Sequence, residues 1–461
     1  MQNTLPTIHV VGAGLAGSEC AYNLAQFGFK VVLYECRPIK TSPAHKTADF
    51  AELVCSNSFG SQTDYSAPGQ LKWEASQLKS VILESAQKST IPAGMALGVD
   101  RIVFAKHVTE EIHNHPNITV SLQVIESLDQ IPRPAVIATG PLTMESLALD
   151  LKKHFGDDFL YFYDAIAPVI ETDSINREIC FPANRFEEGV GDYLNCPFSK
   201  VEYLNFIQAI KDAKKVEQKE FEKTPYFEAC MPVEAILERG DKTLRFGPMS
   251  PKGLIDPRDG RQPYAVVQLR QENIAGTAYN LVGFQTKMSY LDQPRVVRMI
   301  PGLENAAFLK FGSIHKNLYI HSPSRLNKDL SSRFDPDLFF AGQMTGVEGY
   351  FESTCIGLLV AHFLKQKYLE NSFNPPPKDS AFGALLNALT EEKKHFQPTN
   401  INFGLFPPME LENPKKTPKD VKRQLMLDRA KASFLTWNPM RPSIESKQNS
   451  WSHSIEQQPS L

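Results

Sequence analysis

Residues 7–38 read TIHVVGAGLAGSECAYNLAQFGFKVVLYECRP and decide the fold of the chain. An apolar strand leads into a Gly-x-Gly-x-x-Gly turn, an amphipathic helix and a β-branched strand that ends at Glu35. This order predicts a βαβ unit, in which the glycines allow a tight turn and let a pyrophosphate approach a helix N-terminus. The acidic strand end suits ribose hydroxyls, so the stretch predicts a dinucleotide site. Its expected contacts are Gly12, Ala13, Gly14, Leu15, Ala16, Gly17 and Glu35.

A second glycine-bearing segment, residues 337–366, indicates which dinucleotide the chain binds. It reads DLFFAGQMTGVEGYFESTCIGLLVAHFLKQ and predicts a short strand, a glycine-bearing stretch to Gly357 and then a helix. A cofactor held from both ends of the chain points to FAD. The strand and glycine of AVIATGPLT, residues 135–143, are typical of flavoproteins. The further cofactor contacts expected are Gly140, Gly342, Gln343, Gly346, Glu348, Gly349 and Tyr350.

No second Gly-x-Gly-x-x-Gly occurs, so we expect no dedicated nicotinamide domain. NADPH or NADH, if used as reductant, would visit the flavin transiently. The predicted class is α/β: a Rossmann-like, glutathione-reductase-like FAD-binding domain that carries an inserted α+β domain. We expect the first part of the FAD-binding domain over 1–175 and an insertion rich in charge and loops over 176–320. The second part of the FAD-binding domain, with C-terminal helices, is expected over 321–436, and a disordered tail over 437–461.

Composition limits the classes of function. The 461 residues are 42% hydrophobic and 22% charged, enough for a large buried core and two or three domains. The first ten residues lack a basic n-region, and no apolar run reaches membrane-spanning length, so a cytoplasmic protein is expected. A net charge of -3 gives no global sign of nucleic-acid binding. Nothing indicates an obligate protein partner.

The cysteines favour neither a metal site nor disulfides. All seven lie at least 16 residues apart, which excludes CxxC and the usual zinc spacings, and an odd number suits a reducing compartment. Cys20, Cys196 and Cys355 are read as packing residues.

Two other cysteines are candidates for chemistry. Cys230 lies in FEACMPVE, residues 227–234, and precedes a helix predicted over residues 232–240, whose dipole would stabilise a thiolate. Cys55, in FAELVCSNSF, is followed by good helix-capping residues. From the residues alone, the alternative that each is a small buried hydrophobe stays open.

Several strings together resemble the folate- and FAD-dependent tRNA uracil-5-methyltransferase family. The resemblance runs from about residue 8 to 406 and rests on GAGLAGSE, FAELVCSNS, GVDR, IATGPLT, YFYDAIAP, YFEACMP, YNLVGFQT, IPGLENA, FFAGQMTGVEGY and HFQPTNINFGL. It implies that the T-loop uridine of tRNA becomes ribothymidine, with carbon from 5,10-methylenetetrahydrofolate and electrons from reduced FAD. It also implies that Cys230 attacks uracil C6. Cys55 would serve in deprotonation at C5 or in handling the one-carbon adduct near the flavin.

The chain departs from the family pattern at two positions. Gly60 stands where the family usually has an arginine, and Ala229 replaces a glycine before the nucleophile. The substrate could then be a ribosomal RNA uridine, and a flavin oxidoreductase acting on a small metabolite is a further alternative. Basic residues that either contact RNA or form a solvated surface are Lys242, Arg245, Lys415, Lys416, Lys419, Lys422 and Arg423.

Overall fold

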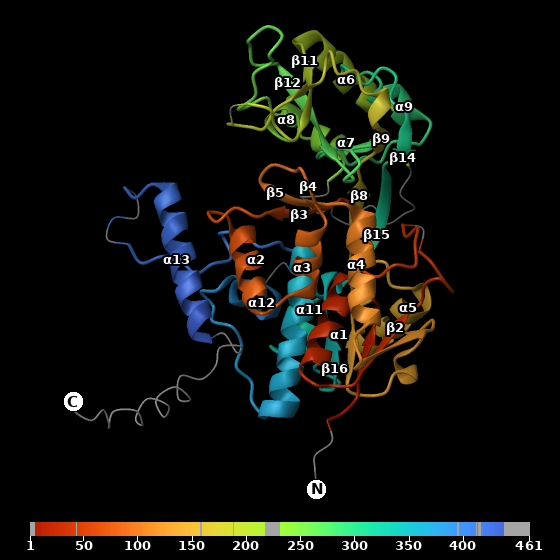
Figure 1. Ribbon diagram of the computed structural model, residues 1–461, viewed down its shortest axis with the longest axis vertical. Coiled ribbons are helices and arrows are strands. Elements are labelled where there is room, and N and C mark those ends of the chain that lie inside the picture. The colour runs from red at the N-terminus through yellow and green to blue at the C-terminus, as the bar shows by residue number, and fades with distance from the viewer. Residues whose placement is uncertain are drawn as a thin grey trace, which may run out of the picture.

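A computed structural model gives the fold, and it has two parts with separate hydrophobic cores, a larger one and a smaller one (Figure 1). The described residues are 5–42, 44–156, 159–187, 189–216, 231–393, 396–411, 413 and 416–437, without the side chains of 159–164 and 315–316.

The larger part is built on a five-stranded parallel sheet with strand order β16-β7-β1-β2-β6. The strands are β1 Ile8–Val11, β2 Val31–Glu35, β6 Ile118–Leu122, β7 Ala135–Ile137 and β16 Leu338–Phe340. Helix α1, Leu15–Gln26, connects β1 to β2, which confirms the predicted βαβ unit. The apolar central strands are buried, as in parallel sheets covered on both faces. The predicted α/β Rossmann-like class is confirmed.

Helix α11, Tyr350–Lys365, packs along α1 (Figure 1). It begins directly after Gly349, so Gly357 lies inside the helix and not before it as expected. A Cβ on Gly357 would collide with the carbonyl oxygen of Ala16. Glycine at this position therefore lets the two helices approach closely. The same part contains α2 Ala67–Gln77, α3 Val81–Lys88, α4 Arg101–His113 and α5 Glu145–Phe155.

The smaller part contains a six-stranded antiparallel sheet with order β10-β11-β12-β13-β9-β14. Its strands are β9 Val169–Glu171, β10 Phe181–Pro182, β11 Leu194–Phe198, β12 Ala265–Gln271, β13 Ala278–Leu281 and β14 Phe308–Lys310. Its helices are α6 Lys200–Asp212, α7 Val233–Leu237, α8 Thr243–Phe246 and α9 Asp292–Val297. Because β9 belongs to this sheet, the sheet starts before residue 176, where a change in composition suggested the boundary.

Two long antiparallel strands, β8 Phe159–Ile166 and β15 Ser313–Ile320, join the two parts. A small sheet of β3 Ser58–Ser61, β5 Ala96–Val99 and β4 Thr90–Ile91 lies between the helices of the larger part and the smaller part (Figure 1). The chain therefore passes through the region between the two parts several times, and residues distant in sequence meet there.

The C-terminal region returns to the larger part. Helices α12, Ala381–Thr390, and α13, Lys419–Trp437, both pack against α2. The described residues between α12 and α13 form no helix, so the C-terminal helices expected within 321–436 are separate elements. Trp437, the first residue of the expected tail, is helical and buried, and 438–461 lie outside the described residues. In the described part of the chain, every helix is too short or too polar to cross a membrane.

Candidate cofactor cradle and active site

The three glycines of the first turn have different surroundings. Gly12 has φ +98°, and a Cβ there would lie 2.7 Å from the carbonyl oxygen of Ala138. A Cβ on Gly17 would collide with the Gly12 carbonyl oxygen. Gly14, which caps α1, has no described atom within 4 Å of its Cβ position. Two glycines thus serve packing, while the third faces open space at a helix N-terminus, where an anion is favoured.

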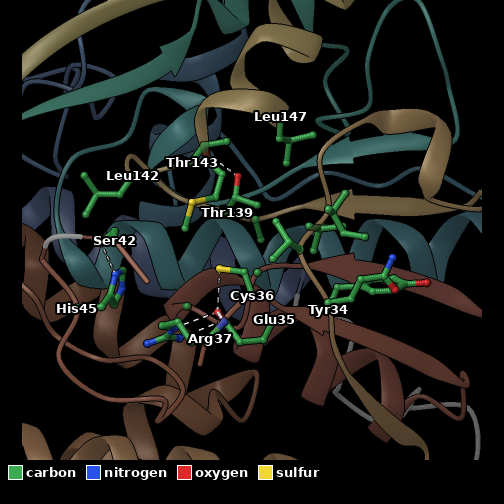
Figure 2. A pocket seen from close by; sticks show the side chains of 18 residues that line it. Tyr34, Glu35, Cys36, Arg37, Ser42, His45, Thr139, Leu142, Thr143 and Leu147 are labelled. Carbon is green, nitrogen blue, oxygen red and sulfur yellow. Dashed lines mark hydrogen bonds and ion pairs between the residues drawn. The ribbon is translucent and has the colours of Figure 1, made fainter. Parts of the chain in front are cut away.

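A cavity opens beside this turn, and Figure 2 shows its opposing walls. Glu35, Cys36 and Arg37 at the end of β2 form one wall, and Thr139, Thr143 and Leu147 line another. The hydroxyls of Thr139 and Thr143 are 2.6 Å apart. The sequence argument identified Glu35 but missed Arg37, two residues later, and the two threonines, which reach the cavity because β7 pairs with β1.

Glu35 is held as a buried anion. One carboxylate oxygen accepts from the Ala13 amide at 3.0 Å, and the other accepts from the Arg37 Nε at 2.9 Å. Burial by itself raises the pKa of Glu35, but the hydrogen bonds and charge of Arg37 outweigh it and lower the pKa to about 2. Glu35 therefore orients the glycine turn through Ala13. Its contact with a ribose stays a prediction.

The second glycine segment lies at the same edge of the parallel sheet. Gly12, Gly140 and Gly342 follow the carboxyl ends of the adjacent strands β1, β7 and β16. In open α/β sheets this edge binds ligands. The left-handed φ angles of Gly140, Gly342, Gly346 and Gly349 run from +70° to +107°, which explains glycine at each position.

Polar residues of the same segment form internal bonds. The Gln343 side chain donates to the Glu348 carboxylate at 3.0 Å, and Glu348 is buried. Its backbone N–H also donates to the Thr399 carbonyl at 2.9 Å. The two side chains therefore brace the turn. Their contact with a cofactor remains a prediction.

Tyr350 brings the second glycine segment to Cys55. Its phenol oxygen accepts hydrogen bonds from the Cys55 amide at 2.6 Å and from the Ser56 amide at 3.2 Å. Cys55 is half-buried in a loop that leads into strand β3, so the helix that its capping residues suggested is absent there.

The other predicted nucleophile, Cys230, lies outside the described residues. The helix expected after it, α7, begins at Val233 with Pro232 as its N-cap, but ends at Leu237. Leu237, its last residue, is buried. The helix has only five residues and therefore few aligned peptide dipoles. The dipole argument for a thiolate at Cys230 is weaker for that reason.

The remaining candidates have clear local roles. Cys20, Cys196 and Cys355 are fully buried, which confirms that they are packing residues. Gly60 has φ +76°, a conformation that an arginine would adopt only with strain, so the backbone explains the departure from the family pattern. Among the described residues, no group of three His, Cys, Asp or Glu side chains could hold a metal ion.

The basic candidates separate into two groups. Arg245 donates to the Tyr264 carbonyl at 2.7 Å and stacks over the Tyr264 ring, so it braces the smaller part, and nearby Lys242 is exposed. Lys416 is exposed, and Lys415 lies outside the described residues. Three cations of α13 line one groove with aromatic side chains of other segments. These cations are Lys419, Lys422 and Arg423, and the aromatic residues are Tyr65 and Phe403.

Comparison with known proteins gives the family. The family model "Glucose inhibited division protein A" matches residues 7–372. A methylenetetrahydrofolate–tRNA-(uracil-5-)-methyltransferase TrmFO from Bdellovibrio bacteriovorus is 61% identical over 94% of this chain and 98% of its own length. The chain belongs to the methylenetetrahydrofolate–tRNA-(uracil-5-)-methyltransferase family. A member of this methyltransferase family from Koribacter versatilis is 48% identical over 93% of this chain and 97% of its own length.

A solved structure agrees with the fold of this methyltransferase family member. The form II crystal of GidA from Aquifex aeolicus has a TM-score of 0.66 and 13% identity, and covers 94% of this chain and 74% of its own. At this identity the likeness shows the fold alone. The cavity beside the Gly12–Gly17 turn, here called the cofactor cradle, fits the FAD expected for the methyltransferase family. Gly14 leaves open space there at a helix N-terminus, and the anionic Glu35 lies beside it.

Proposed function

We propose that the protein methylates C5 of a uridine in tRNA, the T-loop uridine, and so produces ribothymidine. 5,10-Methylenetetrahydrofolate is the carbon donor, and NADPH or NADH is the reductant. The observation that carries the proposal is the bond between Tyr350 and the Cys55 amide, which joins a thiol-bearing loop to the glycine segment beside the cofactor cradle. The printed names of the relatives, which act on tRNA with methylenetetrahydrofolate, support the same reaction.

The residues of this chain have defined tasks in the reaction. Uracil C5 is a poor nucleophile, and addition of a thiolate at C6 makes an enolate that attacks an electrophilic one-carbon unit. Cys230 is the proposed nucleophile at C6, because its sequence matches the family motif. Cys55 is the proposed group that takes the C5 proton or handles the one-carbon adduct. FAD, when bound, supplies the two electrons that turn a methylene into a methyl group.

The RNA is proposed to lie along the groove beside α13. Lys419 and Arg423 are exposed there, and Lys422 is half-buried. These cations suit phosphates, while Tyr65, which is 62% exposed, offers a ring on which a base can stack. Arg423 lies 4.9 Å from the centre of the Phe403 ring and is held in place by it. The groove is also lined by Ser61, at the end of the strand that follows Cys55.

The alternative substrates have no support among the relatives. The two relatives reported above are named for tRNA and methylenetetrahydrofolate, and not for ribosomal RNA or a small metabolite. We therefore keep tRNA as the proposed substrate.

The decisive experiment combines the purified protein with FAD, NADPH, 5,10-methylenetetrahydrofolate and an unmodified tRNA transcript. We expect 5-methyluridine in the digested tRNA, measured by mass spectrometry of nucleosides. The matched control is the same transcript with cytidine at the T-loop target. Equal methylation of both transcripts would exclude the T-loop site, and no methylation of either would exclude the proposed function.

A further inference from the structure

Three consecutive carbonyl groups next to the Cys55 thiol accept hydrogen bonds from two half-buried cations. The Arg101 guanidinium donates to the Leu53 carbonyl at 2.9 Å and to the Cys55 carbonyl at 3.3 Å. The Lys310 ammonium donates to the carbonyl of Val54, which lies between them, at 2.7 Å. Charge-assisted bonds of this kind are stronger than neutral ones. Because three successive peptide planes are held, the direction of the Cys55 Cα–Cβ bond is held as well.

The two cations come from different parts of the molecule. Arg101 is the first residue of α4 in the larger part, whereas Lys310 ends β14 in the antiparallel sheet of the smaller part. Burial, and then the nearby charge of Arg101, lower the pKa of Lys310 to about 8. The loop is therefore held from both sides.

Arg101 is itself fixed by a carboxylate of the smaller part. Its Nε and Nη2 atoms lie 2.7 Å and 2.9 Å from the two carboxylate oxygens of Glu272, which directly follows β12. The pair is largely buried, with 18% of the Arg101 side chain and 8% of the Glu272 side chain exposed. Asn280 on β13 donates a further hydrogen bond to Glu272. This two-point geometry leaves the guanidinium little rotational freedom.

Neighbouring bonds tie the same surfaces together. The Asn57 side chain donates to the Gln271 carbonyl at 2.9 Å and accepts from the Arg270 Nε at 2.9 Å. The carboxylate of Asp100, the N-cap of α4, accepts from the Ile274 amide at 3.0 Å. The smaller part therefore contacts both the residues after Cys55 and the start of the helix that carries Arg101.

We propose that Arg101, Glu272 and Lys310, here called the Cys55 clamp, are positioning residues that hold the Cys55 thiol in its reactive place. Through Glu272 and Lys310, the smaller part thereby controls a thiol that belongs to the larger part. The role of the clamp in turnover rests on the proposed function. Its effect on the position of the thiol does not, because the contacts involve only residues of this chain.

The first test replaces Glu272 by glutamine in the FAD-loaded protein. Glutamine keeps the size of the side chain but removes the charge, and so leaves the Arg101 guanidinium buried without its anion. The loop should open more often, and alkylation of Cys55 by iodoacetamide, followed by mass spectrometry of the Cys55 peptide, should become about fivefold faster. With tRNA and folate, kcat should fall at least about tenfold at an unchanged KM for tRNA, because the thiol is misplaced.

The matched control is Asp335→Asn. Asp335 forms a partly buried ion pair with Arg133 at 2.8 Å, far from Cys55 in sequence and on other elements. This variant loses a comparable ion pair, so it should show the wild-type Cys55 alkylation rate and the wild-type kcat. A change in alkylation as large as that of Glu272→Gln would mean that any lost ion pair loosens the loop, and would overturn the clamp.

A second variant covers the case in which Glu272→Gln does not fold. Arg101→Lys keeps a buried positive charge but cannot bridge two carbonyls and a carboxylate with one ammonium group. It should speed Cys55 alkylation in the same way. Wild-type alkylation in this variant, or in a folded Glu272→Gln, overturns the proposal. Alkylation of Cys55 needs neither tRNA nor folate, so it tests the clamp independently of the proposed function. If the wild-type protein failed to methylate tRNA, the proposed function would be refuted, and the alkylation rates would still decide whether the clamp exists.

Discussion

The phenol oxygen of Tyr350 accepts the backbone N–H of Cys55 at 2.6 Å, across 295 residues of sequence. The same oxygen accepts from Ser56, so one hydroxyl orients two successive amides of the loop. The contact joins the C-terminal glycine segment to the N-terminal loop that carries Cys55.

Tyr350→Phe should lower kcat about tenfold and leave the flavin content unchanged. Phenylalanine keeps the ring but removes the acceptor of two amides, and an unpaired buried donor costs about 1–3 kcal/mol. Flavin absorbance and steady-state kinetics measure the two effects. The control is Tyr368→Phe, which removes a hydroxyl that bonds to Asp337, at the amino end of β16 and so at the sheet edge opposite Gly342. A wild-type kcat in Tyr350→Phe would contradict the prediction.

Gly14→Leu should abolish FAD binding without unfolding the apoprotein. No described atom lies within 4 Å of the Cβ position, so a side chain fits the protein and fills the space intended for the pyrophosphate. Absorbance of the purified protein near 450 nm, a region typical of flavins, shows the loss, and thermal unfolding of both apoproteins shows the intact fold. Gly12→Leu is the contrasting variant, because its Cβ would lie 2.7 Å from the Ala138 carbonyl oxygen and should destabilise the fold itself. A yellow Gly14→Leu protein would place the cofactor elsewhere.

Cys230→Ser should keep the flavin but lose both methyl transfer and covalent trapping. A tRNA with 5-fluorouridine at the target position traps the enzyme only through a sulfur adduct at C6. Denaturing gel electrophoresis detects that adduct. Cys55→Ser should also lose turnover but still form the adduct, because its proposed work lies at C5 or beside the flavin. Near wild-type methylation by Cys230→Ser would show that this cysteine is not the nucleophile.

Lys419→Gln combined with Lys422→Gln should weaken tRNA binding and flatten its dependence on salt. The slope of log K against log salt should decrease by about one for each lost phosphate contact. The matched double variant is Lys152→Gln with Lys153→Gln on α5, where both side chains are exposed and which lies on the opposite side of the molecule from α13 (Figure 1). Binding measured between about 50 and 200 mM salt separates the two. Equal slopes for all three proteins would exclude α13 from the RNA interface.

His362→Leu should stabilise the protein more strongly as the pH falls below 6.5. Both ring nitrogens of His362 are buried without a hydrogen-bond partner in the described part of the chain. Burial, and then the charge of Lys365, lower its pKa from 6.5 to about 3. Between the two pKa values, His362 is protonated in the unfolded chain but neutral in the folded chain. The free energy of unfolding of the wild type therefore decreases by about 1.4 kcal/mol for each unit by which the pH is lowered in this range.

Urea unfolding of both proteins at several pH values between about 7.5 and 5 tests the His362 prediction. Leucine has no proton to bind, so the difference in unfolding free energy between variant and wild type should grow as the pH decreases. Other groups titrate equally in both proteins and cancel in the difference. A difference that stays constant with pH would show that His362 is protonated, or reaches water, in the folded state.

Local patterns were sufficient to predict the parallel sheet and the glycine turns along one of its edges. The βαβ unit over 7–38, the strand before Gly140 and the strand before Gly342 all follow from apolar runs and from glycines with left-handed φ angles. Those properties depend on a few adjacent residues. Cys20 and Cys355 were predicted as packing residues on helices, and Cys196 as a structural residue, and all three are buried.

Only the tertiary structure showed what holds Cys55. The residues after it are good helix-capping residues, but pairing with β5 makes a strand there, because tertiary hydrogen bonds outweigh a local preference. Its partners Tyr350 and Arg101 reach it through strand order and through the contact between the two parts, and Arg101 meets Glu272 across 171 residues. A sequence pattern encodes which residues prefer a strand, a turn or a helix over a few positions. Which distant side chains become neighbours is decided by how the two sheets pack, since that packing buries both cores at once.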